Sequence, residues 1–248
     1  MSKLSYRDIA AIMREEIERG DYPRGTKLPP EPELAARFNT TRATMNNVLR
    51  VLRGEGLIST GQGKGTLVTA MPQRIKRNAM IRYTREARES GVGAFDYEVR
   101  ALGMSPHSEI TVARVTPPPA VAEILGTDGE VVMRSRRMFA DDVPVQIAPS
   151  YIPLDIAAGT ILEEVSQGQG GMVSRMADLG YAQVRMTENI TVRPPTDDEA
   201  DFLQMSTDQR VYVITHVGWT VEDRPVEVCL HVMPTHMWNL DYGWQVDP

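Results

Sequence analysis

The sequence predicts an α+β fold in two domains, a small helical domain closed by a β-hairpin and a larger α/β domain built on an antiparallel sheet. Apolar residues recur at helical spacing in three segments before residue 55, and two short β-type runs follow them. Beyond residue 90 the pattern changes to strands separated by turns, with few helical stretches. The two parts also differ in net charge, +5 for residues 1–76 and −11 for the remainder.

These patterns divide the 248 residues into three parts. Residues 1–70 form the first predicted domain, residues 71–90 a polar and basic linker that is partly helical over 80–89, and residues 91–248 the second domain. A chain of this length can build two hydrophobic cores. Because the first domain is basic and the second is acidic, we expect the first domain to bind a polyanion. The alternative is an uneven charge distribution that arose by chance.

The first domain contains three amphipathic helices. Residues 6–19 form the first, which ends near Gly20, and residues 33–38 form a short second helix. Thr41 is a candidate N-cap for the third helix, which ends at Gly54 or Gly56. The apolar residues expected to face the core are Ile9, Ile12, Met13, Ile17, Leu34, Phe38, Met45, Val48, Leu49 and Leu52.

A glycine-rich stretch, GQGKGT at residues 61–66, separates the two β-type runs LIST and GTLVT. A phosphate-binding Walker A loop would need glycine where Ile58 stands, and a dinucleotide-binding fingerprint would need it at Thr66. Both nucleotide motifs are therefore excluded. Three helices followed by a hairpin are the plan of a winged helix-turn-helix, in which this loop would approach DNA closely. The alternative is an ordinary flexible hairpin turn.

The outer face of the third helix is rich in groups that pair with base edges. Arginine recognises guanine and asparagine recognises adenine, and residues near the start of the recognition helix reach the bases. Arg50 and Arg53 follow later and are expected to contact phosphate or solvent. A merely solvated polar face is the alternative. The predicted DNA-binding residues are Arg42, Thr41, Thr44, Asn46, Asn47 and Arg50, with Gly63, Lys64 and Gly65 from the loop.

The first domain resembles the DNA-binding domain of GntR-type bacterial regulators. The resemblance rests on LPPEPELAARFNTTRATMNNVLRVLRGEGLISTGQGKGTLV, about 40 consecutive positions. The family pattern is roughly LPSERELA…SRxTVRxALxxLxxEGLIxxxxGxGTFV, and its SR arginine corresponds to Arg42. Two of its other DNA-contacting arginines fall on Pro32 and Asn46. The resemblance therefore implies a double-stranded DNA operator that differs from the usual one, with adenine as the expected partner of Asn46.

The second domain contains two similar segments, PVQIAPSYIP at 144–153 and PVEVCLHVMP at 225–234. Each follows a strand and an acidic turn, so both are expected to be β-hairpins that pack in one antiparallel sheet. Helices are expected at 120–126, at 161–179 with a break at 168–171, and after the candidate cap Thr196.

Period-two alternation gives the two returning strands a dry face and a mixed face. Val145, Ile147, Pro149, Tyr151, Val226, Val228, Leu230 and Val232 form the dry face, whereas Ala148, Ile152 and Cys229 accompany polar residues on the other. A mixed face suits a ligand pocket, and an arginine cluster at 134–137 can bind an anion, although the register leaves open which arginine faces the pocket. A half-exposed sheet face with a solvated arginine edge is the alternative. The predicted effector-binding residues are Arg134, Arg136, Gln146, Ser150, Glu227, His231 and Met233.

The second domain resembles the UTRA effector domain of the HutC subclass of GntR regulators, whose fold is similar to that of chorismate lyase. The matching pieces are FDYEVRALGMSP, FADDVPVQIAPSYIP, TDDEADFLQM and DRPVEVCLHVMP. In the family the effector lies between the hairpins. Of the residues that sugar-phosphate binders use, Arg136 and Glu227 are matched, while Met138, Ala94 and Met233 replace an arginine, a serine and a tyrosine. The resemblance therefore implies a small effector other than a sugar phosphate, and a more apolar one.

Composition and motifs exclude several other classes of protein. No run of about 18 apolar residues exists, the N-terminus lacks the apolar region of a signal peptide, and the single Cys229 excludes an intrachain disulfide framework. We therefore expect a cytoplasmic protein without membrane attachment. The four histidines lack metal-binding spacing and no nucleophile elbow occurs, so neither metal, cofactor nor catalytic residue is expected.

These observations predict a transcription regulator, a repressor, that acts as a homodimer on an operator and responds to a small-molecule effector. Two alternatives stay open. The second domain could be a degenerate sensor without ligand, or it could be an enzyme with a lyase-like fold. Release from DNA by an effector would exclude the first alternative, and turnover of a candidate ligand would favour the second.

Overall fold

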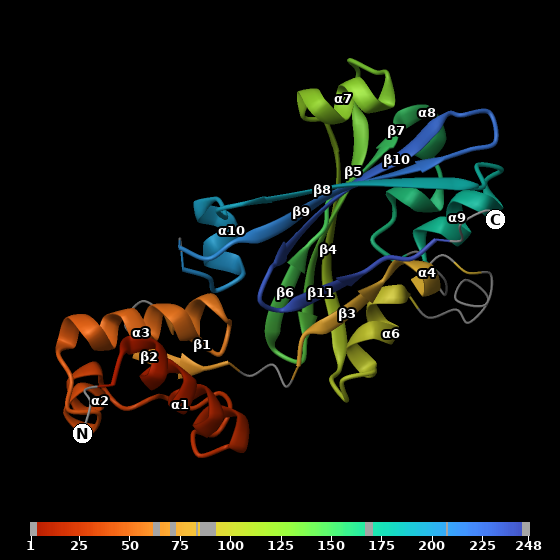
Figure 1. Ribbon diagram of the computed structural model, residues 1–248. Coiled ribbons are helices and arrows are strands. Elements are labelled where there is room, and N and C mark those ends of the chain that lie inside the picture. The colour runs from red at the N-terminus through yellow and green to blue at the C-terminus, as the bar shows by residue number, and fades with distance from the viewer. Residues whose placement is uncertain are drawn as a thin grey trace. The chain divides into compact units, whose positions relative to one another are not determined.

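A computed structural model describes residues 4–61, 65–69, 73–82, 84, 93–166, 171–206 and 208–244. The chain divides into two compact units (Figure 1). Unit 1 consists of Met1–Arg74, Pro194–Arg210 and Pro234–Met237. Unit 2 consists of Ile75–Arg193, Val211–Met233 and Trp238–Pro248. Each unit has its own hydrophobic core.

The three predicted helices of unit 1 are present and have well-defined ends. Helix α1 spans Tyr6–Arg19 and begins in a capping box between Ser5 and Asp8; Gly20, at φ 87°, ends it. Helix α2 spans Glu31–Arg37, two residues earlier than expected, because a proline in the first turn is compatible with a helix start. Helix α3 spans Arg42–Gly54, and the Thr41 side chain accepts a hydrogen bond from the backbone N–H of Thr44.

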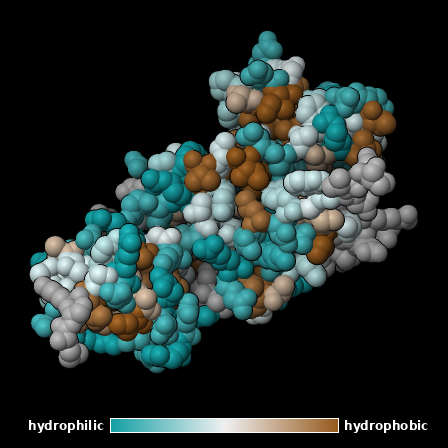
Figure 2. Space-filling view, in the orientation of Figure 1, coloured by the Kyte–Doolittle hydropathy of each residue, from teal (hydrophilic) through white to brown (hydrophobic). Residues whose placement is uncertain are grey.

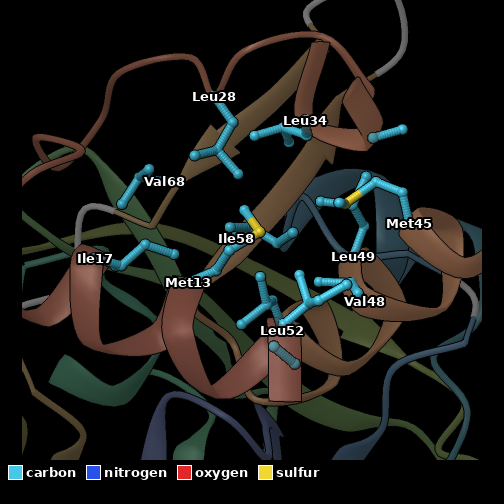
Figure 3. Packing of buried hydrophobic residues seen from close by; sticks show 13 residues of the cluster. Met13, Ile17, Leu28, Leu34, Met45, Val48, Leu49, Leu52, Ile58 and Val68 are labelled. Atoms are coloured by element: carbon cyan, nitrogen blue, oxygen red, sulfur yellow. The ribbon is translucent and has the colours of Figure 1, made fainter. Parts of the chain in front are cut away.

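The core of unit 1 is formed by the inner faces of these helices and a β-hairpin (Figure 3). Strand β1 (Ile58–Gly61) pairs antiparallel with β2 (Gly65–Val68). Eight of the ten predicted core residues are buried. Ile12 and Phe38 are only partly buried, and Phe38 packs against the edge of the cluster. The periodicity of each helix therefore identified its inner face, with errors only at the margins.

A second segment of unit 1 comes from later in the chain. Helix α10 (Asp197–Phe202) begins in the expected capping box at Thr196. Beyond it, the Gln209 side-chain amide donates a hydrogen bond to the Arg53 carbonyl at 2.9 Å. Asp208 lies 3.7 Å from the Arg53 guanidinium. Within unit 1, the end of α3 is therefore contacted by the segment that contains α10.

Unit 2 is built on an antiparallel sheet whose order, over the described residues, is β4-β5-β6-β10-β9-β8, with β7 paired to β10 and β5. The two similar segments lie side by side in it, as Cys229 pairs with Ser150 and Val232 with Ile147. The prediction of two adjacent antiparallel hairpins is thereby confirmed. The strands are β4 (Pro106–Val115), β5 (Val131–Ala140), β6 (Val143–Ile147), β7 (Ser150–Pro153), β8 (Arg185–Arg193), β9 (Val211–Trp219) and β10 (Pro225–Pro234).

Short helices accompany this sheet. Helix α7 (Pro119–Leu125) packs against Tyr151 and Val228 of the predicted dry face, and Figure 2 shows hydrophobic residues gathered over α7 at the top of the view. A second apolar cluster joins Ile152 to helix α8 (Leu154–Ala157), the 3-10 turn η1 (Ile161–Glu163) and α9 (Met172–Asp178). Ile152 is therefore a core residue. Val226, expected on the dry face, packs in this second cluster with it.

The segment expected to be a linker contains regular structure. Strand β3 (Ile75–Asn78) pairs in parallel with β11 (Trp238–Asp241), and helix α4 (Ala79–Arg82) follows it. Arg77 is only 1% exposed. The linker prediction missed the strand at 75–78, because the pairing partner lies some 160 residues away and IKRN has no apolar pattern of its own, whereas the helix expected from residue 80 overlaps α4. No described helix is long and apolar enough to cross a membrane.

Candidate functional site

Helix α3 presents a polar face to solvent. Its apolar residues are buried in the unit 1 core, and this fixes the orientation of the opposite side. Arg42, Asn46, Asn47 and Arg50 are exposed there, as the periodicity predicts. These side chains supply the donors and acceptors that read base edges in a major groove. The arrangement therefore places groups suited to base edges together on one exposed face of a single helix.

The start of α3 is held by two threonines. The hydroxyl groups of Thr41 and Thr44 lie 2.9 Å apart, and Thr41 also caps the helix. Thr44 is half-buried, whereas Thr41 is exposed. In the hairpin, Gly65 is exposed and has φ 79°, a backbone conformation that favours glycine. The other two loop residues predicted to contact DNA, Gly63 and Lys64, lie outside the described residues.

Glu31 is a residue of this surface that the sequence analysis missed. One of its carboxylate oxygens, Oε1, accepts hydrogen bonds from Arg42 Nε at 2.9 Å and from Asn46 Nδ2 at 3.1 Å. Glu31 is the first residue of α2. The signal that could have found it is the short turn between the two helices, which brings the start of α2 close to the first turns of α3.

Unit 2 contains a cavity of about 290 Å³ on the mixed face of its sheet. Five of the seven predicted effector-binding residues line it, namely Arg134, Arg136, Gln146, Glu227 and His231. Ser150 and Met233 are not among the described lining residues, although both are buried. Arg134 pairs with Val112 and Arg136 with Ile110 across the sheet, which places these two arginines on one face and the exposed Arg137 on the other.

The two arginines of the cavity have different partners. Arg134 is 2% exposed, and its guanidinium donates to the backbone carbonyls of Leu162 at 2.8 Å, Val165 at 3.1 Å and Glu164. Arg134 therefore holds the chain around η1 with these donors. Burial, followed by the charge of Arg136, lowers the pKa of Arg134.

Arg136 donates only to neutral groups, among the hydrogen bonds between described residues. Nε donates to the Ala148 carbonyl at 3.1 Å, and a terminal nitrogen donates to Ser150 Oγ at 2.9 Å and Cys229 Sγ at 3.2 Å. Ser150 thus holds the Arg136 side chain in place, although it does not line the cavity itself. No carboxylate of the described chain forms an ion pair with this guanidinium, so the cavity wall carries a positive charge that an acceptor group of a ligand can meet.

The imidazole of His231 is neutral at physiological pH. Burial, followed by the charge of Arg77, lowers the pKa of His231 well below its ordinary value. Its Nδ1 lies 3.0 Å from the side-chain nitrogen of Gln146. Two lining residues back along the same strand, beyond Cys229, a carboxylate oxygen of Glu227 accepts a hydrogen bond from Gln183 at 3.2 Å. Strand β10 therefore brings a carboxylate, a thiol and a neutral imidazole to the cavity.

The cavity also has walls that the sequence analysis did not assign. Ser108 and Ile110 of β4 and His216 of β9 line it from the sheet. Period-two alternation along β4 and β9 could have identified these three. Helices α4, α6 (Ala94–Arg100) and α9 also line the cavity, and their contribution depends on tertiary packing. The described helix residues that line the cavity are Arg82, Ala94, Phe95, Asp96, Met172, Val173 and Ser174.

Comparison with protein families decides the class of the chain. Residues 101–238 match the UTRA domain, which is more than half of the chain. Residues 5–68 match the bacterial regulatory proteins of the gntR family. The chain belongs to the UTRA-domain regulators of the gntR family. It is therefore a transcription regulator that binds DNA through its N-terminal domain and a small-molecule effector through its UTRA domain, and it is not an enzyme.

Individual relatives of this UTRA-domain regulator agree with that assignment. An uncharacterized HTH-type transcriptional regulator of Streptomyces coelicolor is 29% identical over 96% of this chain and 92% of its own. A protein of Escherichia coli K12 named "Probable fructoselysine utilization operon transcriptional repressor" is 24% identical over 91% and 88%. The crystal structure of PhnF from Mycobacterium smegmatis superposes with a TM-score of 0.59 at 20% identity, covering 96% of this chain and all of PhnF. This last likeness establishes the fold.

Proposed function

We propose that this UTRA-domain regulator is a homodimeric repressor whose affinity for a palindromic operator changes when a small molecule occupies the cavity of unit 2. The observation that carries the proposal is the exposed face of α3. Its arginine and asparagine side chains suit base edges, and they lie on the side of the helix opposite its buried apolar residues. Relatives that are named repressors support the direction of control. A two-fold dimer would present two such faces to two half-sites.

On DNA, the residues of α3 divide by position. Arg42 and Asn46 in the first two turns read a guanine and an adenine, and Asn47 reads an adjacent base. Arg50, one turn further on, contacts phosphate together with Lys64 of the hairpin loop. Thr41 and Thr44 support the start of the helix and approach the backbone. Gly63 and Gly65 let the loop lie close to the duplex.

For the effector, the cavity favours a small and largely apolar molecule with one acceptor group opposite Arg136. Phe95, Ile110 and Met138 provide apolar surface, while Gln146 and the neutral His231 provide hydrogen-bonding groups. Met138 stands where the sugar-phosphate pattern has its second arginine. A doubly charged phosphate would therefore lack the second arginine of that pattern.

The path from cavity to α3 follows the chain. Strands β9 and β10 carry His216, Glu227 and His231 into the cavity. The segments next to these strands, 194–210 and 234–237, belong to unit 1, in which Gln209 contacts the end of α3. An effector that binds one arrangement of these strands more tightly than another would shift DNA affinity. A coupling of about 1–3 kcal/mol corresponds to roughly 5- to 150-fold.

Selection of bound duplexes from a random DNA pool, followed by sequencing, tests this function. We expect an enriched palindrome in which guanine and adenine occupy fixed positions of each half-site. Arg42→Ala and Asn46→Ala should each lose preference at one position, and Asn46→Arg should gain a preference for guanine there. Arg100→Ala, which changes an exposed charge of unit 2, is the matched control. Absence of any enriched sequence at low salt would refute the proposal.

A further inference from the structure

Glu31 joins two side chains of the proposed reading surface through a single oxygen atom. Its Oε1 accepts from Arg42 Nε at 2.9 Å and from Asn46 Nδ2 at 3.1 Å. Arg42 and Asn46 are four residues apart on α3, so they lie one above the other on the same helix face. The carboxylate of Glu31 therefore reaches across from α2 and fixes the relative positions of both.

The placement of Glu31 follows from the fold of unit 1. It is the first residue of α2, where a negative side chain interacts favourably with the helix dipole. Its side chain is 20% exposed, whereas that of Arg42 is 76% exposed. The carboxylate is thus set back against the protein while the arginine projects outward. This geometry suits a group that positions other side chains and does not touch the bases itself.

The contact with Glu31 selects one orientation of the Asn46 amide. Because Nδ2 donates one hydrogen to Glu31, the Oδ1 atom and the second N–H point away from the carboxylate. That remaining acceptor–donor pair is complementary to the N6 donor and N7 acceptor of adenine. An unrestrained asparagine could turn its amide over and present the pair in reverse order.

The contact with Arg42 acts in a similar way. Nε is engaged by Glu31, so the two terminal nitrogens are left as an end-on pair of donors. Such a pair matches the O6 and N7 acceptors of guanine. The carboxylate also offsets the positive charge of the guanidinium, which weakens its attraction to phosphates at any sequence. Both effects favour base reading over indiscriminate binding.

We propose that Glu31 is a positioning residue that sets the base specificity of α3 by fixing Arg42 and Asn46 in their reading orientations. The proposal rests on the proposed function, because it requires these two side chains to read bases. Glu31 raises the discrimination at two positions of each half-site and lowers the affinity for random DNA. A residue that only stabilised the fold would change affinity for all sequences alike.

The test compares Glu31→Met with Glu33→Met in the full chain, because methionine matches the length of glutamate and has neither its charge nor its acceptor oxygens. Glu33 is exposed in the same first turn of α2 and makes no described contact with Arg42 or Asn46, so its variant removes the same charge without removing the contacts. Both variants and the wild type are taken through the duplex selection and through titrations with the selected operator, with single-base variants of it, and with random DNA.

For Glu31→Met we expect at least about a fivefold loss of discrimination at the two positions read by Arg42 and Asn46, unchanged preference elsewhere, and equal or tighter binding to random DNA. Glu33→Met should retain the wild-type preferences. In the Asn46→Ala background, Glu31→Met should have no further effect at the adenine position. Glu31→Asp, whose shorter side chain cannot reach both partners, should reproduce the loss if the methionine variant folds poorly.

Three outcomes would overturn the proposal. Glu31→Met and Glu31→Asp could both keep the full preference at every position, or Glu31→Met and Glu33→Met could lose it equally, which would indicate a charge effect alone. In either case the wild type still enriches an operator and the proposed function stands. If the wild type itself enriches no sequence, the proposed function fails and the role of Glu31 fails with it.

Discussion

Glu188 is the centre of a buried cluster in unit 2. Its carboxylate receives a hydrogen bond from Tyr242 at 2.5 Å, contacts Nδ1 of His216 at 3.1 Å and forms an ion pair with the buried Arg77. Burial alone raises the pKa of Glu188, but the hydrogen bond with His216 and the charge of Arg77 outweigh burial and lower it to about 2. Burial and the neighbouring Glu188 raise the pKa of Tyr242 to about 12.

This cluster gives the stability of unit 2 a defined pH dependence. The pKa of Glu188 is lower in the folded chain than its ordinary value of 4.5, so ionised Glu188 stabilises the fold above pH 4.5. The contribution, about 3 kcal/mol, is lost as the pH falls from 4.5 towards 2. Urea unfolding at a series of pH values should show this loss in the wild type and a smaller one in Glu188→Gln.

The control for this measurement is Glu222→Gln, which changes an exposed carboxylate between β9 and β10. Its stability should follow the wild-type pH curve. The Glu188 variant should also be less stable than the wild type at pH 7, because Arg77 loses its charged partner in a buried site. Parallel pH curves for all three chains would contradict the role assigned to Glu188.

At the level of single elements, α3 depends on its N-cap. The Thr41 hydroxyl accepts from the backbone N–H of Thr44 at 3.2 Å, and loss of such a cap costs about 0.5–2 kcal/mol. Thr41→Ala should therefore lower the free energy of unfolding of unit 1 by about 1 kcal/mol, and Thr41→Ser should restore most of it. Chemical denaturation without DNA measures this, so that any direct contact with DNA does not contribute. Equal stability of the alanine and wild-type chains would argue against the cap.

Strand β3 allows a different test, since its sequence resembles a linker. Lys76 and Arg77 lie in a strand that pairs residue by residue with β11, from Ile75 with Trp238 to Asn78 with Asp241. Trypsin needs an unfolded segment to cut, so we expect resistance after both residues in the native chain. Mass spectrometry of a limited digest identifies the cut sites, and the chain unfolded in urea is the control. Rapid native cleavage after Lys76 would show that β3 does not form stably.

The elements that could be predicted from the sequence are those whose pattern is local. The helices of unit 1, the cap at Thr41 and the two repeated hairpins follow from spacing within about 20 residues. Strand β3 could not be found in this way, because its partner β11 lies near the other end of the chain. The cavity was predicted from the alternation of β6, β7 and β10, whereas the walls from α6 and α9 depend on packing. Glu31 was missed because its role depends on the turn between two helices.

At the scale of the whole molecule, the DNA-binding part and the effector-binding part of the chain have opposite net charges. Residues 1–76 carry +5, and the rest of the chain carries −11. The acidic part repels DNA at long range, so the affinity for polyanion is concentrated in the DNA-binding domain. The phosphate contacts of the basic domain also make the affinity for DNA strongly dependent on salt. Each phosphate that the protein neutralises contributes about −0.9 to the slope of log affinity against log salt concentration.

The same slope can show how many copies of the DNA-binding domain are bound to the operator. Arg50 is exposed on α3 one turn beyond Asn46, in the position of a phosphate contact. If a homodimer places two copies of α3 on the duplex, Arg50→Ala removes two contacts and should reduce the magnitude of the slope by about 1.8, against about 0.9 for a single bound domain. Fluorescence anisotropy with the selected operator, from about 50 to 200 mM salt, measures this difference. Arg100→Ala should leave the slope unchanged, because Arg100 lies on α6 of unit 2. A reduction near 0.9 would mean that one copy of α3 engages the DNA, which would contradict the two-fold operator.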